Sequence, residues 1–345
     1  MPNNLPVTTK RAVEVVRFML LLGIIGVVLF AAFVLIAIQP AASGTQALNQ
    51  VVHVAPGMSA GEIAVLLKNE GLIPNAAVFL LLTKIIRAEQ HLQAGYYLLN
   101  SAMSSLEIID HLRTGDVATE RVVIPEGFEI KQIAGLLAER GLAEKDRFIA
   151  LAADAKAVFG DNLPLDLPID SLEGYLFPDT YYFSRGQSEE DLIGQMVNRF
   201  VQVVEEELRD LLAGSEFTLH EVATLASIVE REIMVDHERP LVASVYLNRL
   251  AVDMPMQADP TVRYVMSEDR ARVLYSDLEI ESPYNTYRYR GLPPGPIASP
   301  GLKSMQAVLN PAQTDYFYFV SRGDGTHQFS RTFDEHVRAR QMLGY

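Results

Sequence analysis

An uncharged stretch of 21 residues near the start, residues 18–38, constrains this chain more than any other feature. It reads FMLLLGIIGVVLFAAFVLIAI. A helix needs about 20 apolar residues to cross the hydrocarbon core of a bilayer, and a helix buried in a soluble protein seldom runs this long without a polar face. We therefore predict a transmembrane helix over residues 18–38.

The charges that flank this stretch predict its orientation. Three basic residues and one acid precede it, and no Lys or Arg follows it until Lys68. The positive-inside rule then places residues 1–17 in the cytoplasm and everything after the span outside. A cleaved signal peptide is the alternative, since Ala41-Ala42-Ser43 resembles a cleavage site, but its apolar region is normally only about 7–15 residues long.

Composition excludes several classes of function. The chain has no cysteine, which excludes a lipid anchor on Cys, disulfides, a thiol nucleophile and thiolate metal ligands. The net charge is −14, and because the first 38 residues carry +3 −1 = +2, the remainder carries −16. Such acidity argues against binding to nucleic acid or tight docking on anionic lipid. The roughly 300 residues after the span suffice for a hydrophobic core.

An internal duplication follows an uncharged linker over residues 39–50. Residues 54–79 read VAPGMSAGEIAVLLKNEGLIPNAAVF, and residues 123–148 read VIPEGFEIKQIAGLLAERGLAEKDRF. Each copy predicts a strand, a Pro/Gly turn and an amphipathic helix, which Gly71 or Gly141 is suited to end. Two copies are too few for a solenoid. We predict two small βα units, which serve either as packing modules or as a sugar-binding module.

The rest of the chain mixes helices with short strands. Helical patterns run from about 150 to 215 and over 218–251, and a Pro- and Tyr-rich region extends to about 301. Residues 316–320 and 328–330 predict a hairpin across the turn 322–325, and a last helix runs from Phe333 to Met342. This order predicts an α+β fold rather than a regular βα alternation.

The helix starting at Thr218 carries the first candidate for chemistry. Thr218 and Glu221 have the spacing of a capping box, and the apolar stripe consists of Val222, Leu225, Val229 and Ile233. Glu230 shares a neighbouring face with Ala226 and Ser227, small residues that leave room for a ligand. Burial on such a face would raise a carboxyl pKa, as a general acid requires. On spacing alone, a solvated helix end is the commoner meaning of this pattern.

Two later segments carry candidate sugar-binding residues. Asn248, Gln257 and Asp259 are polar residues among apolar ones, and amides both donate and accept hydrogen bonds; a turn after a helix is the structural alternative. Tyr284, Asn285 and Tyr287 lie in SPYNTYRYRGLPPGPIASPG, a stiff loop that cannot form a central strand. Its tyrosines are suited to stack on sugar rings, and a surface tie between two elements is the alternative.

Other chemistries find little support in the sequence. Seven histidines are present, but His327 and His336 do not have metal-ligand spacing. The chain lacks the nucleophile elbow, the Walker A loop and the dinucleotide-binding glycine pattern. We expect no metal and no cofactor.

Several long motifs, in order, resemble the signatures of one family. They are LEGYLFPDTY, ASIVERE, YLNRL, MPMQADPTVRY, SPYNTYRYRGLPPGPIASPG, AVLNP and YFYFVSRGDGTHQFSRTFDEH. The chain thereby resembles the endolytic murein transglycosylase (YceG-like) family from about residue 50 to its end. Met and Ala in MPMQADPTV, where many relatives have Leu and Ser, and AVLNP in place of ALNP are mild departures from the pattern.

The resemblance implies a domain plan and a function. It implies a LysM-like module over residues 51–118 and a transglycosylase catalytic domain over 119–345, which includes the second βα unit at about 121–150. It implies Glu230 as the catalytic residue of the A-S-I-V-E motif, acting in the periplasm on nascent peptidoglycan strands. The implied partners are these strands and the synthases of the bacterial plasma membrane.

The mechanism expected from the resemblance uses one carboxyl group. Protonated Glu230 would protonate the glycosidic oxygen between MurNAc and GlcNAc, then accept a proton from the C6 hydroxyl as it attacks C1 and forms a 1,6-anhydro end. Asn248, Gln257, Asp259, Tyr284, Asn285 and Tyr287 are the candidate sugar-binding residues. A muramidase would need a second carboxylate, with Asp259 or Glu173 the nearest candidates. A non-catalytic peptidoglycan-binding scaffold for wall synthases is the third hypothesis.

Overall fold

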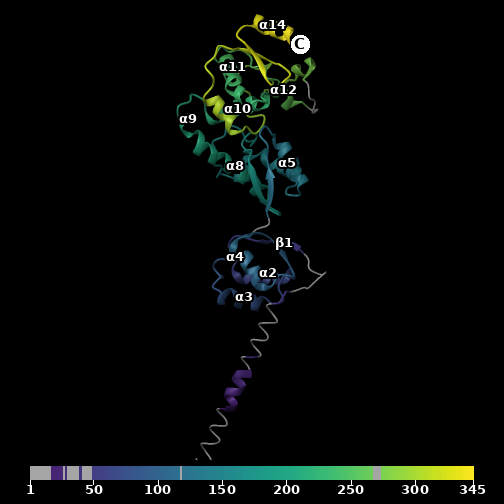
Figure 1. The fold of residues 1–345 in the computed structure, drawn as a ribbon, viewed down its shortest axis with the longest axis vertical. Helices are drawn as coiled ribbons and strands as arrows, with labels where there is room; N and C mark the ends of the chain where they lie inside the picture. Colours follow the sequence, from purple (N-terminus) through teal and green to yellow (C-terminus); the bar gives the residue numbers. More distant parts are fainter. Residues whose placement is uncertain (1–16, 26–27, 29–38, 41–48, 117–118, 267–272) are drawn as a thin grey trace, which may run out of the picture. The chain divides into compact units, whose positions relative to one another are not determined.

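The computed structural model describes residues 17–25, 28, 39–40, 49–116, 119–266 and 273–345 (Figure 1). The predicted membrane helix over residues 18–38 lies largely outside the described residues. Among the described residues, no helix combines the length and the apolar character needed to cross a membrane. Contacts divide the chain into two compact units: residues up to Thr119 with Ser184–Gly186, and Glu120–Phe183 with Gln187–Tyr345.

The smaller unit packs a two-stranded antiparallel sheet against three helices. Its strands are β1 (Asn49–Val54) and β2 (Gly95–Asn100), and its helices are α2 (Ala60–Asn69), α3 (Ala76–Ile85) and α4 (Ser105–Thr114). Alternate strand residues are buried, so one face of the sheet is covered by the core. These buried residues are Val52, Val54, Tyr97 and Leu99.

The larger unit has two cores of its own. The first is built by β3 (Thr119–Val123), α5 (Ile130–Glu139), α6 (Lys145–Ala152), α7 (Ala155–Phe159), β4 (Thr180–Ser184) and α8 (Glu189–Val203). A π-helical turn, η2 (Val204–Leu208), and α9 (Arg209–Ala213) lead to the second. The second core is built around α10 (Leu219–Glu232), α11 (Arg239–Ala251), α12 (Asp259–Val265) and α13 (Leu302–Leu309).

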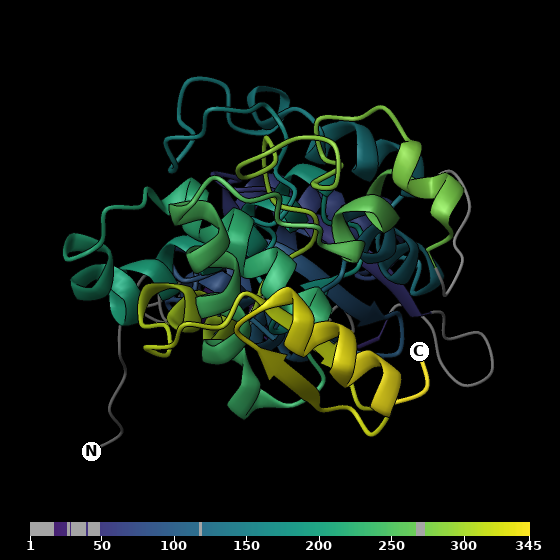
Figure 2. The ribbon, with the colours of Figure 1, turned by 90° about the horizontal axis from the view of Figure 1, so that it is seen from above.

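A hairpin and a helix complete the larger unit. β5 (Tyr318–Ser321) pairs with β6 (His327–Ser330), and α14 (Phe333–Met342) packs on both strands. Figure 2 shows the yellow helix of this C-terminal segment lying beside the hairpin. The short helices η3 (Asp236–Glu238) and η4 (Tyr275–Glu279) precede α11 and follow α12. The described residues thus form a mixed α+β structure with three two-stranded sheets, which confirms the predicted fold class.

The duplicated sequence pattern corresponds to a duplicated local structure. β1–α2–α3 and β3–α5–α6 follow the same order. Gly71 and Gly141 take φ angles of 70° and 66° just after α2 and α5, so the predicted helix ends are confirmed. In both copies the next leucine donates its N–H to the carbonyl five residues back, at 2.9 Å, and Leu72 and Leu142 are buried.

Helix α10 lies at the centre of the second core. Thr218 and Glu221 form the predicted capping box, which fixes where the helix starts. All residues from 222 to 229 are buried, including Thr224 and Ser227. Apart from Glu221 in its first turn, α10 carries acidic and basic side chains only in its last turn, because α11, α12 and α13 pack around the rest of the helix. The charged side chains in the last turn of α10 are therefore positioned by the helices that pack around it.

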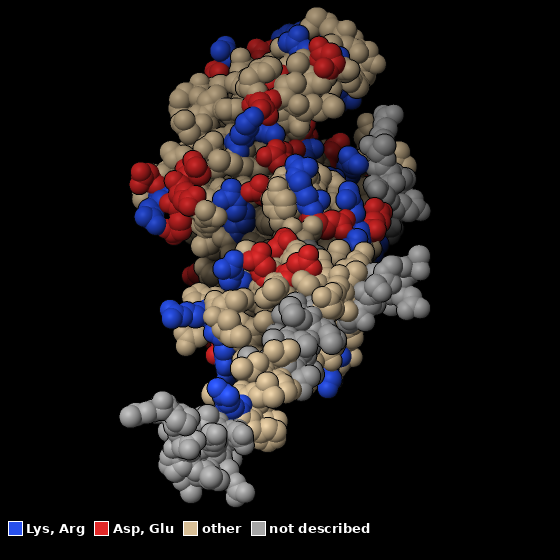
Figure 3. Space-filling view, turned by 60° about the horizontal axis from the view of Figure 1, so that its bottom comes forward, with Lys and Arg blue, Asp and Glu red and all other residues tan. Residues whose placement is uncertain are grey.

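Described residues of both charges lie on one face of the molecule. On the face shown in Figure 3, Lys and Arg side chains are interspersed with Asp and Glu side chains. This face therefore offers no broad basic area of the kind that binds a polyanion.

Candidate active site

Two glutamates in the last turn of α10 enter different surroundings. Glu230 and Glu232 lie two residues apart, which is about 200° around a helix. Each carboxyl group consequently meets a different part of the second core, and the two groups are considered in turn.

Glu230 has both carboxylate oxygens engaged. Oε1 accepts a hydrogen bond from Arg239 Nη2 at 3.1 Å. Oε2 accepts from the Gly301 N–H at 3.0 Å and from the Ser304 hydroxyl at 2.8 Å. The Glu230 side chain is only 6% exposed. It thereby joins the end of α10 to the starts of α11 and α13.

A second carboxylate that the sequence did not indicate lies beside Glu230. Glu126 follows β3, and its carboxylate is 3.6 Å from Arg239 Nη2. Its side chain fills the space that a Cβ on Gly301 would need. Burial, and then the negative charge of Glu230, raise the pKa of Glu126. Arg239, itself 7% exposed, therefore holds Glu126 and Glu230 together, and its Nη2 also lies 3.5 Å from the Asp236 carboxylate.

This arrangement has the character of a buried ion-pair network. An arginine, a backbone amide and a hydroxyl together engage both oxygens of the Glu230 carboxylate. Removing one partner of such a pair leaves an uncompensated buried charge, which costs about 3–5 kcal/mol. The geometry around Glu230 therefore positions three helices relative to one another.

Glu232 lies in a pocket and has a different electrostatic environment. The Tyr246 hydroxyl, on α11, donates a hydrogen bond to its Oε1 at 2.7 Å. Burial, and to a smaller extent the charge of Asp259, raise the pKa of Glu232, which is about 7. The Tyr246 hydrogen bond and the charge of Arg249 oppose this increase. A carboxyl group with such a pKa holds its proton on a substantial fraction of molecules at neutral pH.

The pocket around Glu232 has a volume of about 340 Å³. Its walls come from the end of α10, from α11, from the segment that leads into α12, from β5 and from α14. It is lined by Glu232, Tyr246, Arg249, Met256, Gln257, Asp259, Tyr287, Tyr318, Phe319, Phe333, His336 and Arg340. Polar and aromatic side chains thus face one cavity with a carboxyl group of raised pKa, a combination typical of active sites.

Three of the predicted sugar-binding residues line this pocket together. They are Gln257, Asp259 and Tyr287. The Tyr287 hydroxyl donates to Asp259 Oδ1, and Gln257 has a φ of 51°. A positive φ in a residue other than glycine costs energy and is found often at functional sites.

The other three predicted residues do not line it. Asn248 donates its side-chain amide to the carbonyls of Thr314 and Tyr316, at 3.0 and 2.9 Å. Asn285 is fully buried and donates to the carbonyls of Leu278 and Ile280. The Tyr284 ring packs against Tyr264, with ring centroids 5.0 Å apart. These side chains hold loops in place.

Arg249 supports the pocket wall from within. Its guanidinium donates to the Phe317 carbonyl at 2.7 Å and to the Met256 carbonyl, and it lies over the Tyr318 ring at 5.3 Å. It thereby ties α11 to the segments before α12 and β5. These bonds leave Arg249 a fixed positive charge near Glu232.

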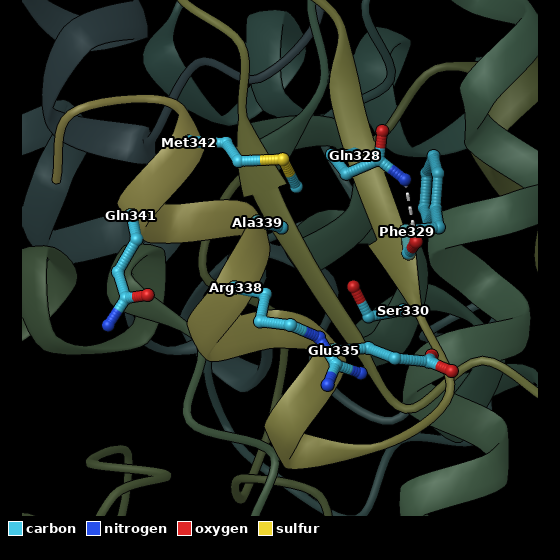
Figure 4. A pocket seen from close by; sticks show the side chains of 8 residues that line it. All are labelled: Gln328, Phe329, Ser330, Glu335, Arg338, Ala339, Gln341 and Met342. Atoms are coloured by element: carbon cyan, nitrogen blue, oxygen red, sulfur yellow. Dashed lines mark hydrogen bonds between the residues drawn. The ribbon is translucent and has the colours of Figure 1, made fainter.

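A larger hollow of about 580 Å³ lies between β6 and α14 (Figure 4). Its one carboxyl group, Glu335, accepts hydrogen bonds from the Arg331 and Thr332 N–H groups and caps α14. Of its other polar side chains, Ser330 is buried, whereas Arg338 and Gln341 are exposed on the surface. Because its acid is used in the cap, this hollow is a poorer candidate for acid/base chemistry than the smaller one.

The position of Glu232 in the sequence indicates that its side chain is partly buried. Glu232 is three residues after Val229 and seven after Leu225, so it follows two members of the buried stripe. A carboxyl group at such a position indicates a functional role, because charged groups are rarely buried.

In the described part of the chain, no cluster of three or more His, Asp or Glu side chains could hold a metal ion.

Comparison with known proteins assigns the family. The sequence model of the YceG-like family matches residues 52–342. The chain belongs to the YceG-like family. A Bacillus subtilis protein named endolytic murein transglycosylase is 36% identical over 305 residues, which cover 84% of this chain and 83% of that protein.

Other YceG-like relatives are similar over comparable lengths. A Streptococcus pneumoniae protein, also named endolytic murein transglycosylase, is 31% identical over 318 residues, covering 83% of this chain and 57% of that protein. A crystal structure of a YceG-like protein from Listeria monocytogenes has 35% identity and a TM-score of 0.59. That match covers 85% of this chain and 99% of the other.

Proposed function

We propose that this YceG-like protein is an endolytic transglycosylase that cuts the glycan strands of peptidoglycan. The family and the names of its relatives support the reaction class. The observation that carries the proposal is the carboxyl group of Glu232. It has a pKa of about 7 and lies in a pocket with Gln257, Asp259 and Tyr287.

The proposed mechanism uses Glu232 as acid and then as base. Protonated Glu232 gives its proton to the glycosidic oxygen as the bond from C1 of MurNAc to GlcNAc breaks. The resulting carboxylate accepts the proton of the C6 hydroxyl of the same MurNAc, whose oxygen bonds to C1. Glu232 is thereby reprotonated, and the products are a free GlcNAc hydroxyl and a 1,6-anhydro-MurNAc end. Intramolecular attack benefits from a high effective concentration.

Glu230 is the alternative acid/base, since the A-S-I-V-E motif indicates it. Three donors, from Arg239, Gly301 and Ser304, engage both carboxylate oxygens of Glu230 and tie it to α11 and α13. Glu232 accepts one hydrogen bond, from Tyr246, and faces the pocket. The geometry therefore favours Glu232, and substitution of each residue decides between them.

A muramidase is the second candidate function, because Asp259 lines the same pocket as Glu232. Two carboxyl groups in one cavity are what hydrolysis by water requires. Tyr287 donates to Asp259, however, and this bond holds the Asp259 carboxylate in the wall. We favour the transglycosylase, in which one carboxyl group suffices.

The cellular setting is part of the same proposal. The apolar stretch at residues 18–38 and its basic flank support a single-pass anchor in the bacterial plasma membrane, with the pocket on the periplasmic side. Residues 51–118, whose described part is a small α/β unit, are proposed as a LysM-like module. Cutting nascent strands beside the membrane synthases would then end their elongation.

Mass spectrometry of the products tests the reaction. Purified residues 39–345 are incubated with uncrosslinked glycan strands, and the new ends are weighed before and after borohydride reduction. Ends one water lighter than hydrolysis products, and resistant to borohydride, are the expected result. Reducing, hydrated ends would indicate the muramidase, and binding without any cutting would indicate a scaffold.

A further inference from the structure

One face of the C-terminal helix α14 forms part of the pocket wall. Phe333, His336 and Arg340 have helical spacings of three and four residues, and all three line the Glu232 pocket. The opposite face of α14, which includes Arg338, Ala339 and Met342, borders the other hollow (Figure 4). Neither the sequence motifs nor the family assignment gives the residues on the pocket side a role.

Helix α14 is fixed firmly enough to present this face. Thr332 and Glu335 form a capping box at its start, and Ala339 is buried against the hairpin. The Tyr318 ring of β5 lies 5.3 Å from the His336 ring and 5.8 Å from the Phe333 ring. The hairpin and the helix therefore form one rigid wall of the pocket.

Phe333 is an exposed ring at a cavity rim. Its exposed fraction is 61%, although it touches Tyr318 and borders the pocket. A pyranose ring presents C–H groups that pack well on the face of an aromatic ring. Phe333 is thus suited to stack on a sugar that extends out of the pocket.

Arg340 contributes a positive charge to the pocket, for which neutral sugars offer no oppositely charged partner. It lines the same pocket as His336, and its charge, after burial, lowers the pKa of His336. The other arginine of the pocket, Arg249, is bound to backbone carbonyls. The side chain of Arg340 has no ion pair with the described residues. Guanidinium groups bind carboxylates with two parallel hydrogen bonds.

The carboxylates available on a peptidoglycan strand lie on its stem peptides. The lactyl carboxyl group of MurNAc is consumed in the amide that attaches the peptide, so the sugars of a peptide-bearing strand are neutral. We propose that the Phe333–Arg340 face of α14 is a subsite for a peptide-bearing sugar, where Phe333 stacks on the ring and Arg340 binds a stem-peptide carboxylate. This inference rests on the proposed function, because it names the substrate class of the same pocket.

The test compares two forms of one substrate. Uncrosslinked strands with native stem peptides are compared with the same strands after their peptide carboxylates are capped as methylamides. Wild-type kcat/KM should fall about tenfold on capped strands. Arg340→Gln should lower kcat/KM on native strands to the same level and should no longer distinguish the two substrates.

Two further variants complete the experiment. Arg338→Gln removes an exposed arginine from the other face of α14 and should behave as wild type. Phe333→Leu keeps an apolar side chain but removes the flat ring. It should lower kcat/KM by the same factor on native and on capped strands. The inference would be overturned if Arg340→Gln still cut native strands with a higher kcat/KM than capped strands, as wild type does. It would also be overturned if Arg338→Gln lost as much kcat/KM on native strands as Arg340→Gln.

Binding measurements separate this inference from the proposed reaction. Fluorescently labelled strands of both forms are titrated into Glu232→Gln and into Glu232→Gln with Arg340→Gln. If Glu232→Gln binds native strands more tightly than capped strands, and the double variant does not, the result supports the subsite. This holds even if wild type does not cleave the strands. Equal binding of both strand forms to the single variant rejects it even if wild type cleaves as proposed.

Discussion

At the scale of single residues, Glu230 and Glu232 show how neighbours decide what a carboxyl group can do. Glu230 meets three donors, including a guanidinium, and these hold its carboxylate group between three helices. Glu232 meets one tyrosine hydroxyl, and its burial raises its pKa to about 7. Two positions on one helix thus obtain opposite roles from the elements packed beside them.

Replacing Tyr246 with Phe should shift the pH dependence of cleavage. The Tyr246 hydrogen bond lowers the pKa of Glu232, so its removal raises that pKa further. Because a general acid works while protonated, kcat/KM in wild type should fall as pH rises through about 7. In Tyr246→Phe this fall should occur at higher pH. A pH–rate profile that is unchanged or moves to lower pH would contradict the role of Glu232 as the acid.

At the scale of elements, Glu173 connects the loop 172–179 to helix α5. Its carboxyl group accepts hydrogen bonds from the Ile130 N–H at 3.1 and 3.3 Å, at the start of α5. Burial raises the pKa of Glu173 to about 8. The next residue, Gly174, has a φ of 84°, and a Cβ there would come within 2.3 Å of the Pro296 ring. This loop is therefore fixed by one acid and one glycine.

Replacing Gly174 with Ala should destabilise the larger unit. A positive φ and a clash with a proline ring each cost about 1–3 kcal/mol, so a loss of about 2–4 kcal/mol is expected. Gly135→Ala is the matched control, because Gly135 lies inside α5 with free space around it. That variant should gain up to about 1 kcal/mol. Denaturant unfolding of both variants measures the difference, and equal stabilities would contradict this account of the loop.

Replacing Glu173 with Gln should change how stability depends on pH. The native state keeps a proton on Glu173 up to about pH 8, whereas the unfolded chain releases it near 4.5. Between these values the native state binds more protons, so this group makes the protein less stable as pH rises. Glu173→Gln removes that loss, by at most about 5 kcal/mol at high pH. Thermal unfolding from pH 5 to 8.5 should show a growing advantage of the variant, and a constant difference would argue against a buried neutral acid.

The elements were largely predictable from the sequence, because their signals are local. The capping box at Thr218, the glycines that end α2 and α5, and the last helix all follow from neighbouring residues. The pocket was predictable only in part. Gln257, Asp259 and Tyr287 were indicated, but Asn248 and Asn285 proved to bind backbone carbonyls. Which polar side chain ties a loop and which faces a cavity depends on packing between distant segments.

At the scale of the whole molecule, the pocket gathers residues from 232 to 340. No local pattern brings α10, the segment before α12 and α14 to one cavity; the second core does so. The rim of α14 was missed for this reason, whereas Glu232 was missed although it follows the buried stripe of α10. The membrane anchor, unlike the pocket, is predicted from a local feature, the apolar composition of residues 18–38. A fusion that reports the location of each terminus would test the predicted orientation.

The initial rate at which Glu232→Gln forms 1,6-anhydro ends tests the central claim most directly. The account predicts a loss of at least about 100-fold, with a melting temperature below pH 7 equal to or above that of wild type, because glutamine then replaces a protonated carboxyl group. Glu230→Gln is the matched comparison. It should lose about 3–5 kcal/mol of stability but cut within about tenfold of the wild-type rate where it is folded. Wild-type cutting by Glu232→Gln, with a folded and inactive Glu230→Gln, would contradict the account and assign the chemistry to Glu230.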